Sequence, residues 1–186
     1  MRHLNKGRKL GRNPNHQRAL LRSLVIAILM TERDASDDDN APKTPGRIIT
    51  TLEKAKEVRP FLEKCITIAK KAQKPLREAA ELATKASRDS AEWKKWRESD
   101  RWQAWNKAVA PAVAARRRAL QLIGSKEAVR ILFDVVAPRF ENRNGGYTRI
   151  LKLAGFRLGD AGKRAILEFV GKNDRIKARS HRPAVE

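Results

Sequence analysis

The chain has 186 residues, a length typical of one domain or of one domain with an insertion. Its 42 lysines and arginines outnumber its 21 aspartates and glutamates, so the formal net charge is +21. A positive charge of this size indicates a polyanionic partner, nucleic acid above all, and argues against an enzyme that acts on cationic substrates. The single cysteine, Cys65, excludes an intramolecular disulfide framework and a multi-cysteine zinc site, and indicates a reducing compartment.

The first 22 residues contain seven lysines and arginines and no acid. With so little apolar surface, residues 1–14 are predicted to form an extended basic arm that becomes ordered on a polyanion; a disordered, solvated tail is the alternative. Asn13 can cap a helix that starts at Pro14, and apolar residues recur at helical spacing from Leu20 to Ile28. The apolar run at 24–30 is too short for a membrane span, which needs about 20 residues, and no signal-peptide cleavage motif follows it.

Residues 15–72 are expected to form the first part of the folded domain. Residues 33–46 are rich in aspartate and proline, which predicts a solvated loop rather than a metal site. A strand is predicted at 47–50, followed by a helix to about residue 72. A capping box of Thr50 and Glu53 should start this helix, and Pro60 should kink or divide it. Cys65 falls on the apolar stripe and is expected to be a core residue rather than a nucleophile.

Residues 73–113 are predicted to be a helical insertion with a different composition. All four tryptophans lie there in two pairs, Trp93 with Trp96 and Trp102 with Trp105. The pairs are nine residues apart, so they can share one face only if the helix bends near Ser99. The rings could stack on RNA bases beside the neighbouring cations, or they could pack a helical hairpin against itself or a protein neighbour; packing is favoured. Pro111 is expected to break the helix.

Residues 114–171 complete the expected domain, and a loose basic tail is expected at 172–186. Ser125 can cap a helix that Pro138 should end near Ala137. Strands are predicted at 147–153 and 165–170, on either side of a glycine-containing loop. The coarse order of helices and strands indicates an α/β (α+β) class: a compact domain with a small three-stranded sheet covered by helices.

The paired glycines Gly145 and Gly146 permit a tight turn and a close approach of backbone to a ligand. Three arginines and Tyr147 lie near this turn and the following glycine loop, which favours a second RNA-binding patch. The alternative is that the glycines only set a turn and that Tyr147 belongs to the core.

Motifs for catalysis and for cofactors are absent from the sequence. It has no phosphate loop, no dinucleotide fingerprint and no serine elbow, and its three histidines are scattered without acidic or cysteine partners. We therefore expect no enzyme activity, no metal and no cofactor, and no small-molecule substrate.

Three blocks of the sequence resemble the L17 family of bacterial large-subunit ribosomal proteins. They cover residues 2–22, residues 49–70 and the segment from Pro138 to Val170, whose Gly-Gly-Tyr-Thr-Arg-Ile-Leu-Lys run at 145–152 is highly specific. The resemblance implies a structural component of the cytoplasmic ribosome, with a compact α/β fold and a basic arm. It also implies binding to large-subunit ribosomal RNA beside neighbouring ribosomal proteins near the polypeptide exit region. The loop at 33–46 and the segment at 73–113 depart from the family pattern.

The predicted RNA-binding surface combines the arm and the patch at the glycine turn. Its residues are Arg2, His3, Lys6, Arg8, Lys9, Arg12, His16, Arg18, Arg22, Arg143, Gly145, Gly146, Tyr147, Arg149 and Arg157. Imidazoles could stack on bases or donate to phosphate, or they could be ordinary exposed or packed side chains. A free-standing nucleic-acid-binding architectural or assembly factor is the main competing class, and an RNA-modifying enzyme is disfavoured because cofactor motifs are missing.

Overall fold

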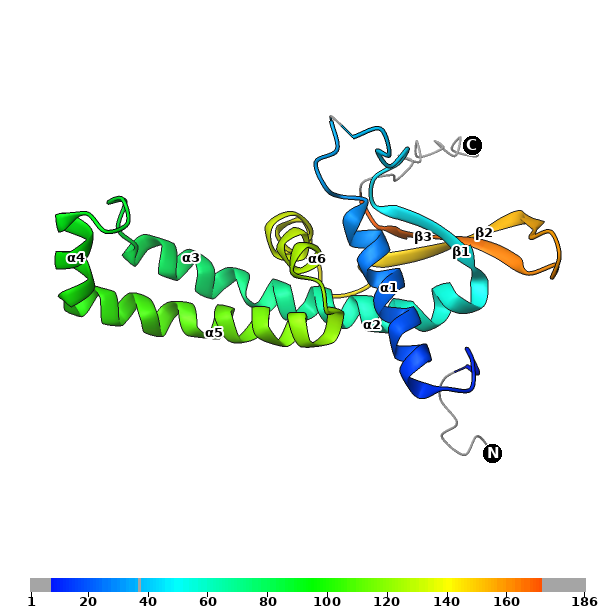
Figure 1. Cartoon of the computed structure of the whole chain (residues 1–186), viewed down its shortest axis with the longest axis horizontal. Coiled ribbons are helices and arrows are strands. Elements are labelled where there is room, and N and C mark those ends of the chain that lie inside the picture. Colours follow the sequence, from blue (N-terminus) through cyan, green and yellow to red (C-terminus); the bar gives the residue numbers. More distant parts are fainter. Residues whose placement is uncertain (1–7, 37, 172–186) are drawn as a thin grey trace, which may run out of the picture.

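The computed structural model describes residues 8–36 and 38–171. Figure 1 shows two regions: a body, in which helices pack around a small sheet, and a long helical projection that extends away from it. Arg2, His3, Lys6 and the predicted tail at 172–186 lie outside the described residues.

Helix α1, Pro14–Met30, begins as predicted. The Asn13 side chain accepts a hydrogen bond from the Asn15 backbone N–H at 2.8 Å, and Pro14 occupies the first helical position, where its missing N–H costs nothing. The helix buries Val25, Ile28 and Leu29 and leaves its other side to polar and basic residues. The 17 residues of α1 therefore connect the arm to the core.

Strand β1, Arg47–Thr51, runs directly into helix α2, Leu52–Lys71. The predicted capping box is wrong, because the strand continues through Thr51 and that residue caps the helix without a side-chain hydrogen bond. Pro60 does not divide α2 either. One face of this helix contributes a continuous row of buried residues to the core, and this burial outweighs the lost backbone hydrogen bond. The buried residues are Leu52, Ala55, Val58, Leu62, Cys65, Ile66 and Ala69.

The predicted three-stranded sheet is confirmed, and with it the α+β class. Strands β2, Thr148–Phe156, and β3, Lys163–Phe169, form a hairpin, and the sheet order is β1-β3-β2 with both pairs antiparallel. Helix α2 contacts all three strands, and its buried row packs with Ala165, Leu167 and Phe169 in one core. Both strands of the hairpin continue closer to its turn than predicted. The hydrogen-bonded pairing of these strands extends past the core, and the residues there are exposed, so they show no apolar pattern in the sequence.

The helix after Ser125 continues further than predicted. Ser125 caps α6, Lys126–Ile131, as expected, and the helical path then runs through η1, Leu132–Val136, and α7, Ala137–Arg139. Segment η1 is a π-helix in which the Ala137 backbone N–H donates to the Leu132 carbonyl, five residues back. This wider turn makes room for the Pro138 ring, which clashes with the carbonyl four residues back in a regular helix.

The segment predicted as a helical insertion lies in the projection, which consists of α3, Gln73–Leu82, α4, Ala91–Glu98, and α5, Asp100–Ile123. Helices α3 and α5 lie side by side, and α4 stands at their far end (Figure 1). The prediction of a break at Pro111 is wrong. Helix α5, which is 24 residues long, is continuous through Pro111, and this proline is on the exposed side of the helix. The chain does bend at Ser99, the condition under which the tryptophan pairs can share one face; the Ser99 backbone is extended between α4 and α5.

The bend at Ser99 brings tryptophans of both pairs together. The rings of Trp96 and Trp105 meet edge to face, with centroids 5.6 Å apart. The guanidinium of Arg97 lies 5.1 Å from the Trp93 ring and 5.9 Å from the Trp102 ring. The tryptophans therefore pack the end of the hairpin, which is the alternative that the sequence favoured.

Candidate nucleic-acid interface

The described part of the arm presents cations along the outer side of the body. Lys9, Arg12 and His16 are exposed, and the Arg8 guanidinium lies 3.4 Å from the Glu57 carboxylate on α2. This ion pair places the end of the arm beside α2. The three outer residues stay free to face a large anionic partner.

Arg18 and Arg22 form a ridge on the exposed side of α1, one turn apart. Arg22 is fixed at the carboxyl end of α5, where its Nε donates to the Leu122 carbonyl at 2.9 Å and its Nη2 to the Gln121 carbonyl at 3.1 Å. Helix carbonyl ends favour cations, so this contact stabilises α5 and orients the guanidinium. Arg18 has no hydrogen-bond or ion-pair partner within residues 8–36 and 38–171.

A groove of about 640 Å³ lies between this ridge and α5. Its charged residues are Arg18, Arg22 and Arg118, all positive, and its apolar floor includes Leu21 and Phe61. Three guanidinium groups around a groove without an acid are suited to phosphate groups, which they can bind through paired N–H donors. Arg118 is not among the site residues predicted from the sequence, although it belongs to a run of three arginines, Arg116–Arg118, that could have indicated it.

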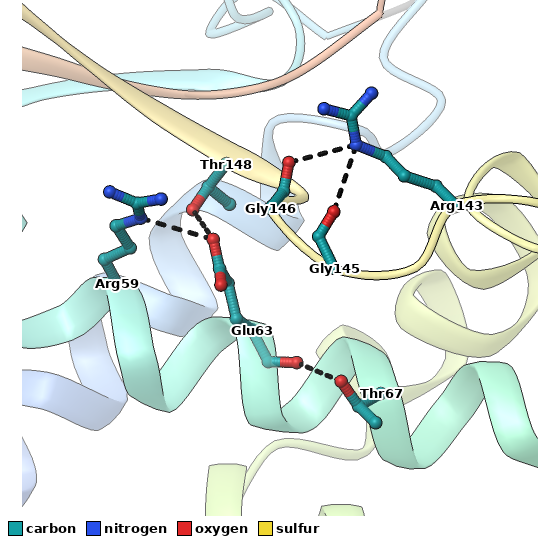
Figure 2. Close-up of polar contacts among 7 residues, drawn as sticks. All are labelled: Arg59, Glu63, Thr67, Arg143, Gly145, Gly146 and Thr148. Carbon is teal, nitrogen blue, oxygen red and sulfur yellow. Dashed lines mark hydrogen bonds and ion pairs between the residues drawn. The ribbon is translucent and has the colours of Figure 1, made fainter.

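Both glycines of the turn adopt a left-handed backbone. Gly145 has φ of 104° and Gly146 has φ of 60°, and a Cβ at either position would meet nothing within 4 Å. Arg143 closes the turn itself, because its Nε donates to the carbonyls of Gly145 and Gly146 at 3.2 and 3.1 Å. In Figure 2 the two terminal nitrogens of Arg143 point away from the turn.

Tyr147 belongs to the core and not to a surface patch. Its side chain is only 3% exposed, and its ring lies 5.2 Å from that of Phe140. Lys70 covers it, with Nζ 5.9 Å from the ring centroid and a hydrogen bond to the Arg143 carbonyl at 2.7 Å. The structure thus agrees with the alternative in which Tyr147 packs inside, and we leave it out of the interface.

The turn is attached to α2 through a polar network around Glu63 (Figure 2). Thr148 Oγ1 donates to the Glu63 carboxylate at 2.9 Å, and Arg59 Nε donates to the same oxygen at 3.3 Å. The Thr67 hydroxyl donates to the Glu63 backbone carbonyl at 2.9 Å. Helix α2 therefore holds the start of β2 in place, and with it the direction in which Arg143 extends.

Arg149 is engaged with a buried carboxylate on the sheet. Its Nε lies 2.5 Å from Glu168, whose other oxygen is 3.1 Å from Arg47 Nη2, so one acid on β3 joins arginines on both flanking strands. The Glu168 side chain is fully buried, while each arginine is about one-third exposed. These contacts hold the sheet together and leave part of Arg149 open to solvent.

Arg157 does not lie at the glycine turn, which corrects the idea of a single patch. It comes after β2, eight residues beyond Arg149, or roughly 25 Å of extended chain. There it pairs with Asp160, and its hydrogen bonds, with one from the Gly162 N–H, hold the pKa of Asp160 well below its usual range. Of the three patch arginines, Arg143 and Arg149 lie near the turn, at the other end of the strand.

Groups that could support chemistry are engaged in structure. Burial raises the pKa of the Cys65 thiol to about 11, so it is a neutral core residue near pH 7, as expected. Within residues 8–36 and 38–171 no three histidine, cysteine or acidic side chains gather in a way that could hold a metal ion. No helix in the same ranges is long and apolar enough to cross a membrane.

The fold and the exposed cations together define a class: a small, strongly basic α+β protein with an arm and grooves suited to a polyanion. Comparison with known protein families identifies the family to which the chain belongs. The family model described as ribosomal protein L17 matches residues 20–170, and the chain belongs to this family of ribosomal proteins of the large subunit.

Alignments with individual relatives cover nearly the whole chain. It is 62% identical over 186 residues to the large ribosomal subunit protein bL17 of Rhodopirellula baltica, an alignment that covers 100% of this chain and 89% of that protein. It is 35% identical to the bL17 protein of Acidobacterium capsulatum, over 99% of this chain and 81% of the relative. It is 31% identical to the bL17 protein of Mesorhizobium japonicum, over 100% of this chain and 92% of the relative.

Proposed function

We propose that this protein is a structural constituent of the large ribosomal subunit in the cytoplasm and binds ribosomal RNA through its basic arm and the ridge on α1. The observation that carries the proposal is the groove between α1 and α5, whose charged residues are Arg18, Arg22 and Arg118 without an acid. The arm directly precedes α1, the helix that contributes Arg18 and Arg22 to this groove. Family membership supplies the partner, because the relatives are named as proteins of the large subunit.

Binding at this surface is electrostatic anchoring combined with shape. The arm follows the RNA backbone, the ridge arginines bind phosphates at the groove, and each neutralised phosphate releases counterions. Arg143 provides a further contact beside the glycine turn, which α2 holds in place. Contacts of this kind fix position and orientation without reading base sequence, which is what a protein built into one site of a folded RNA requires.

Neighbouring ribosomal proteins near the polypeptide exit region are the other partners that we propose, on the basis of the family resemblance. A free-standing nucleic-acid-binding factor is the competing function, because composition and surface charge are the same for both classes.

The salt dependence of binding to deproteinised large-subunit ribosomal RNA tests the proposal. Replacing Arg18→Gln and Arg118→Gln together removes two groove cations and leaves Arg22, which holds α5, in place. We expect weaker binding and a salt slope reduced by about 1.5, since each phosphate contact contributes about 0.7 to 0.9. The control is Lys85→Gln with Lys107→Gln, which removes the same charge from exposed positions on the projection.

The control variant should bind with almost the wild-type slope. Equal affinities and equal slopes for the groove variant, the control and the wild type would contradict a role of this groove in RNA binding. Failure of the wild type to bind ribosomal RNA at moderate salt would contradict the proposed function as a whole.

A further inference from the structure

A second groove lies at the opposite end of the sheet from the glycine turn, and of the predicted site residues only Arg157 lines it. It has a volume of about 700 Å³ and is formed where β1 runs into α2, beside the turn of the β2–β3 hairpin. The residues used below are Ile49, Lys54, Phe156, Arg157, Leu158 and Arg164. These come from three separate stretches of the chain that only the sheet brings together.

The apolar residues of this groove are exposed to an unusual degree. Phe156 is 62% exposed, Leu158 98% and Ile49 57%, so three large apolar side chains lie open together. Ile49 pairs with Ile166 on the face of the sheet opposite the buried Leu167. Contiguous exposed apolar surface of this kind marks a binding site more often than a chance exposure.

Its charged residues are all positive. Lys54 is in the first turn of α2, Arg164 is near the start of β3, and Arg157 lies between them at the hairpin end. No acidic side chain is among the lining residues. An acidic protein segment and an RNA strand both carry negative charge, but only RNA combines it at regular intervals with flat rings that stack on an exposed aromatic side chain.

The hairpin end is held in a fixed conformation, which favours binding because little freedom remains to be lost. Arg157 is paired with Asp160, and the Arg157 backbone N–H donates to the Gly162 carbonyl at 3.0 Å. Asp160 also accepts a hydrogen bond from the Gly162 N–H at 3.2 Å. These contacts close the loop that carries Leu158 and fix the position of Phe156 beside it.

We propose that this groove binds an unpaired RNA nucleotide, whose base stacks on Phe156 while an adjacent phosphate contacts Lys54 and Arg164. This inference rests on the proposed function, since it names a second and separate contact with the same class of ligand. The two contacts differ in kind: the ridge on α1 binds the backbone alone, whereas the hairpin groove holds a base as well.

The test measures binding of the full chain to deproteinised large-subunit ribosomal RNA. Phe156→Ala removes the stacking surface and Phe156→Trp keeps it; residue 156 is exposed, so thermal melting should show an intact fold for both variants. Stacking of one base corresponds to a loss of between about five-fold and about a hundredfold in affinity for Phe156→Ala. Phe156→Trp should bind at least as tightly as the wild type. Lys54→Gln with Arg164→Gln removes the contact with one phosphate and should lower the salt slope by about 0.7 to 0.9, against the Lys85→Gln and Lys107→Gln control.

The outcomes separate this inference from the proposed function. Wild-type binding that falls in Phe156→Ala and returns in Phe156→Trp supports both. Wild-type binding that is unchanged in Phe156→Ala and in the Lys54 and Arg164 variant overturns the nucleotide site and leaves the proposed function standing. If those variants bind RNA normally but assemble poorly into large subunits, the groove contacts a protein neighbour, and the nucleotide site is again overturned. A wild type that does not bind the RNA overturns both.

Discussion

The body and the projection of this protein are stabilised in different ways. The body buries large side chains such as Phe133, Phe169 and Leu62, and the sheet, α1 and α2 enclose them. Along the projection, the buried apolar positions of the helix pair include Ala79 and Ala112, and the tryptophans at its end stay partly exposed. Small residues let two helices approach closely but remove little apolar area from water. For the helices of the projection, the free energy of local unfolding should therefore be well below the free energy of unfolding of the body.

The largest effect is expected from Phe169→Ala. This side chain is fully buried on β3, and its removal leaves a cavity between the sheet and Phe140, at a cost of about 3 to 5 kcal/mol of unfolding free energy. Urea unfolding measured by circular dichroism gives the value. Phe156→Ala, the same substitution at an exposed position of β2, is the control and should cost under about 1 kcal/mol. Equal losses for the two variants would contradict the location of the core.

The next effect concerns pH and is also confined to the body. Burial raises the pKa of Cys65 to about 11, while an unfolded thiol titrates at about 8.5. The neutral thiol thus contributes stability that is complete below about pH 8.5 and is lost as the pH rises through 11. The loss attributable to this group is at most about 3 kcal/mol.

Urea unfolding at pH 8 and at pH 11 measures this loss, with Cys65→Ala as the reference. The substitution removes the titrating thiol, and the packing that it loses is the same at both pH values, so the wild type should lose more stability than the variant over this range. The same loss in both would show that Cys65 titrates as freely in the folded chain as in the unfolded one.

Trp96→Ala should affect the projection and not the body. Its ring meets Trp105 across the bend at Ser99, and removing it should cost about 1 to 2 kcal/mol locally. Amide hydrogen exchange resolves the two regions. We expect faster exchange in α4 and the start of α5, with unchanged protection of the buried face of α2. Equal acceleration in α2 would mean that the projection and the body unfold as one unit.

The smallest effect is expected from Arg97→Gln. The guanidinium lies over the Trp93 and Trp102 rings in an exposed setting, where one cation–π contact is worth about 0.5 to 1 kcal/mol. Hydrogen exchange of α4 should rise slightly. Lys95→Gln, which removes the same charge from an exposed position two residues earlier, is the matched control and should leave the exchange unchanged. Identical exchange in both variants would indicate that Arg97 does not stabilise the cluster.

Features of the fold that depend on a few neighbouring residues could be predicted from sequence. The starts of α1 and α6 were correct because Asn13 and Ser125 hydrogen-bond to N–H groups only two or three residues away. That the helical path is continuous through Pro60, Pro111 and Pro138 could not be predicted, because the sequence shows the lost hydrogen bond but not the packing of α2 and α5 or the π-turn before Pro138. Strand ends beyond the core were missed for the same reason: the ladder that extends them is a tertiary contact.

The candidate site, too, could be predicted from the sequence only in part. The basic character of the arm and of α1 follows directly from the sequence, because runs of like charge need no folding to be recognised. Whether a given cation is available depends on partners that are distant in sequence, such as Asp134 for Arg116 and Glu168 for Arg149. The groove at Phe156 was not predicted, because its lining residues from 49 to 164 become neighbours only in the sheet.

We propose that ribosomal RNA holds this chain in the large subunit as one of its constituents. Sedimentation of a cell lysate through a sucrose gradient in high salt, followed by detection of this chain, tests it most directly. We predict co-migration with the large subunit at about one copy per particle. Migration with free protein, under conditions in which other core ribosomal proteins stay bound, would contradict the claim and favour a free-standing nucleic-acid-binding protein.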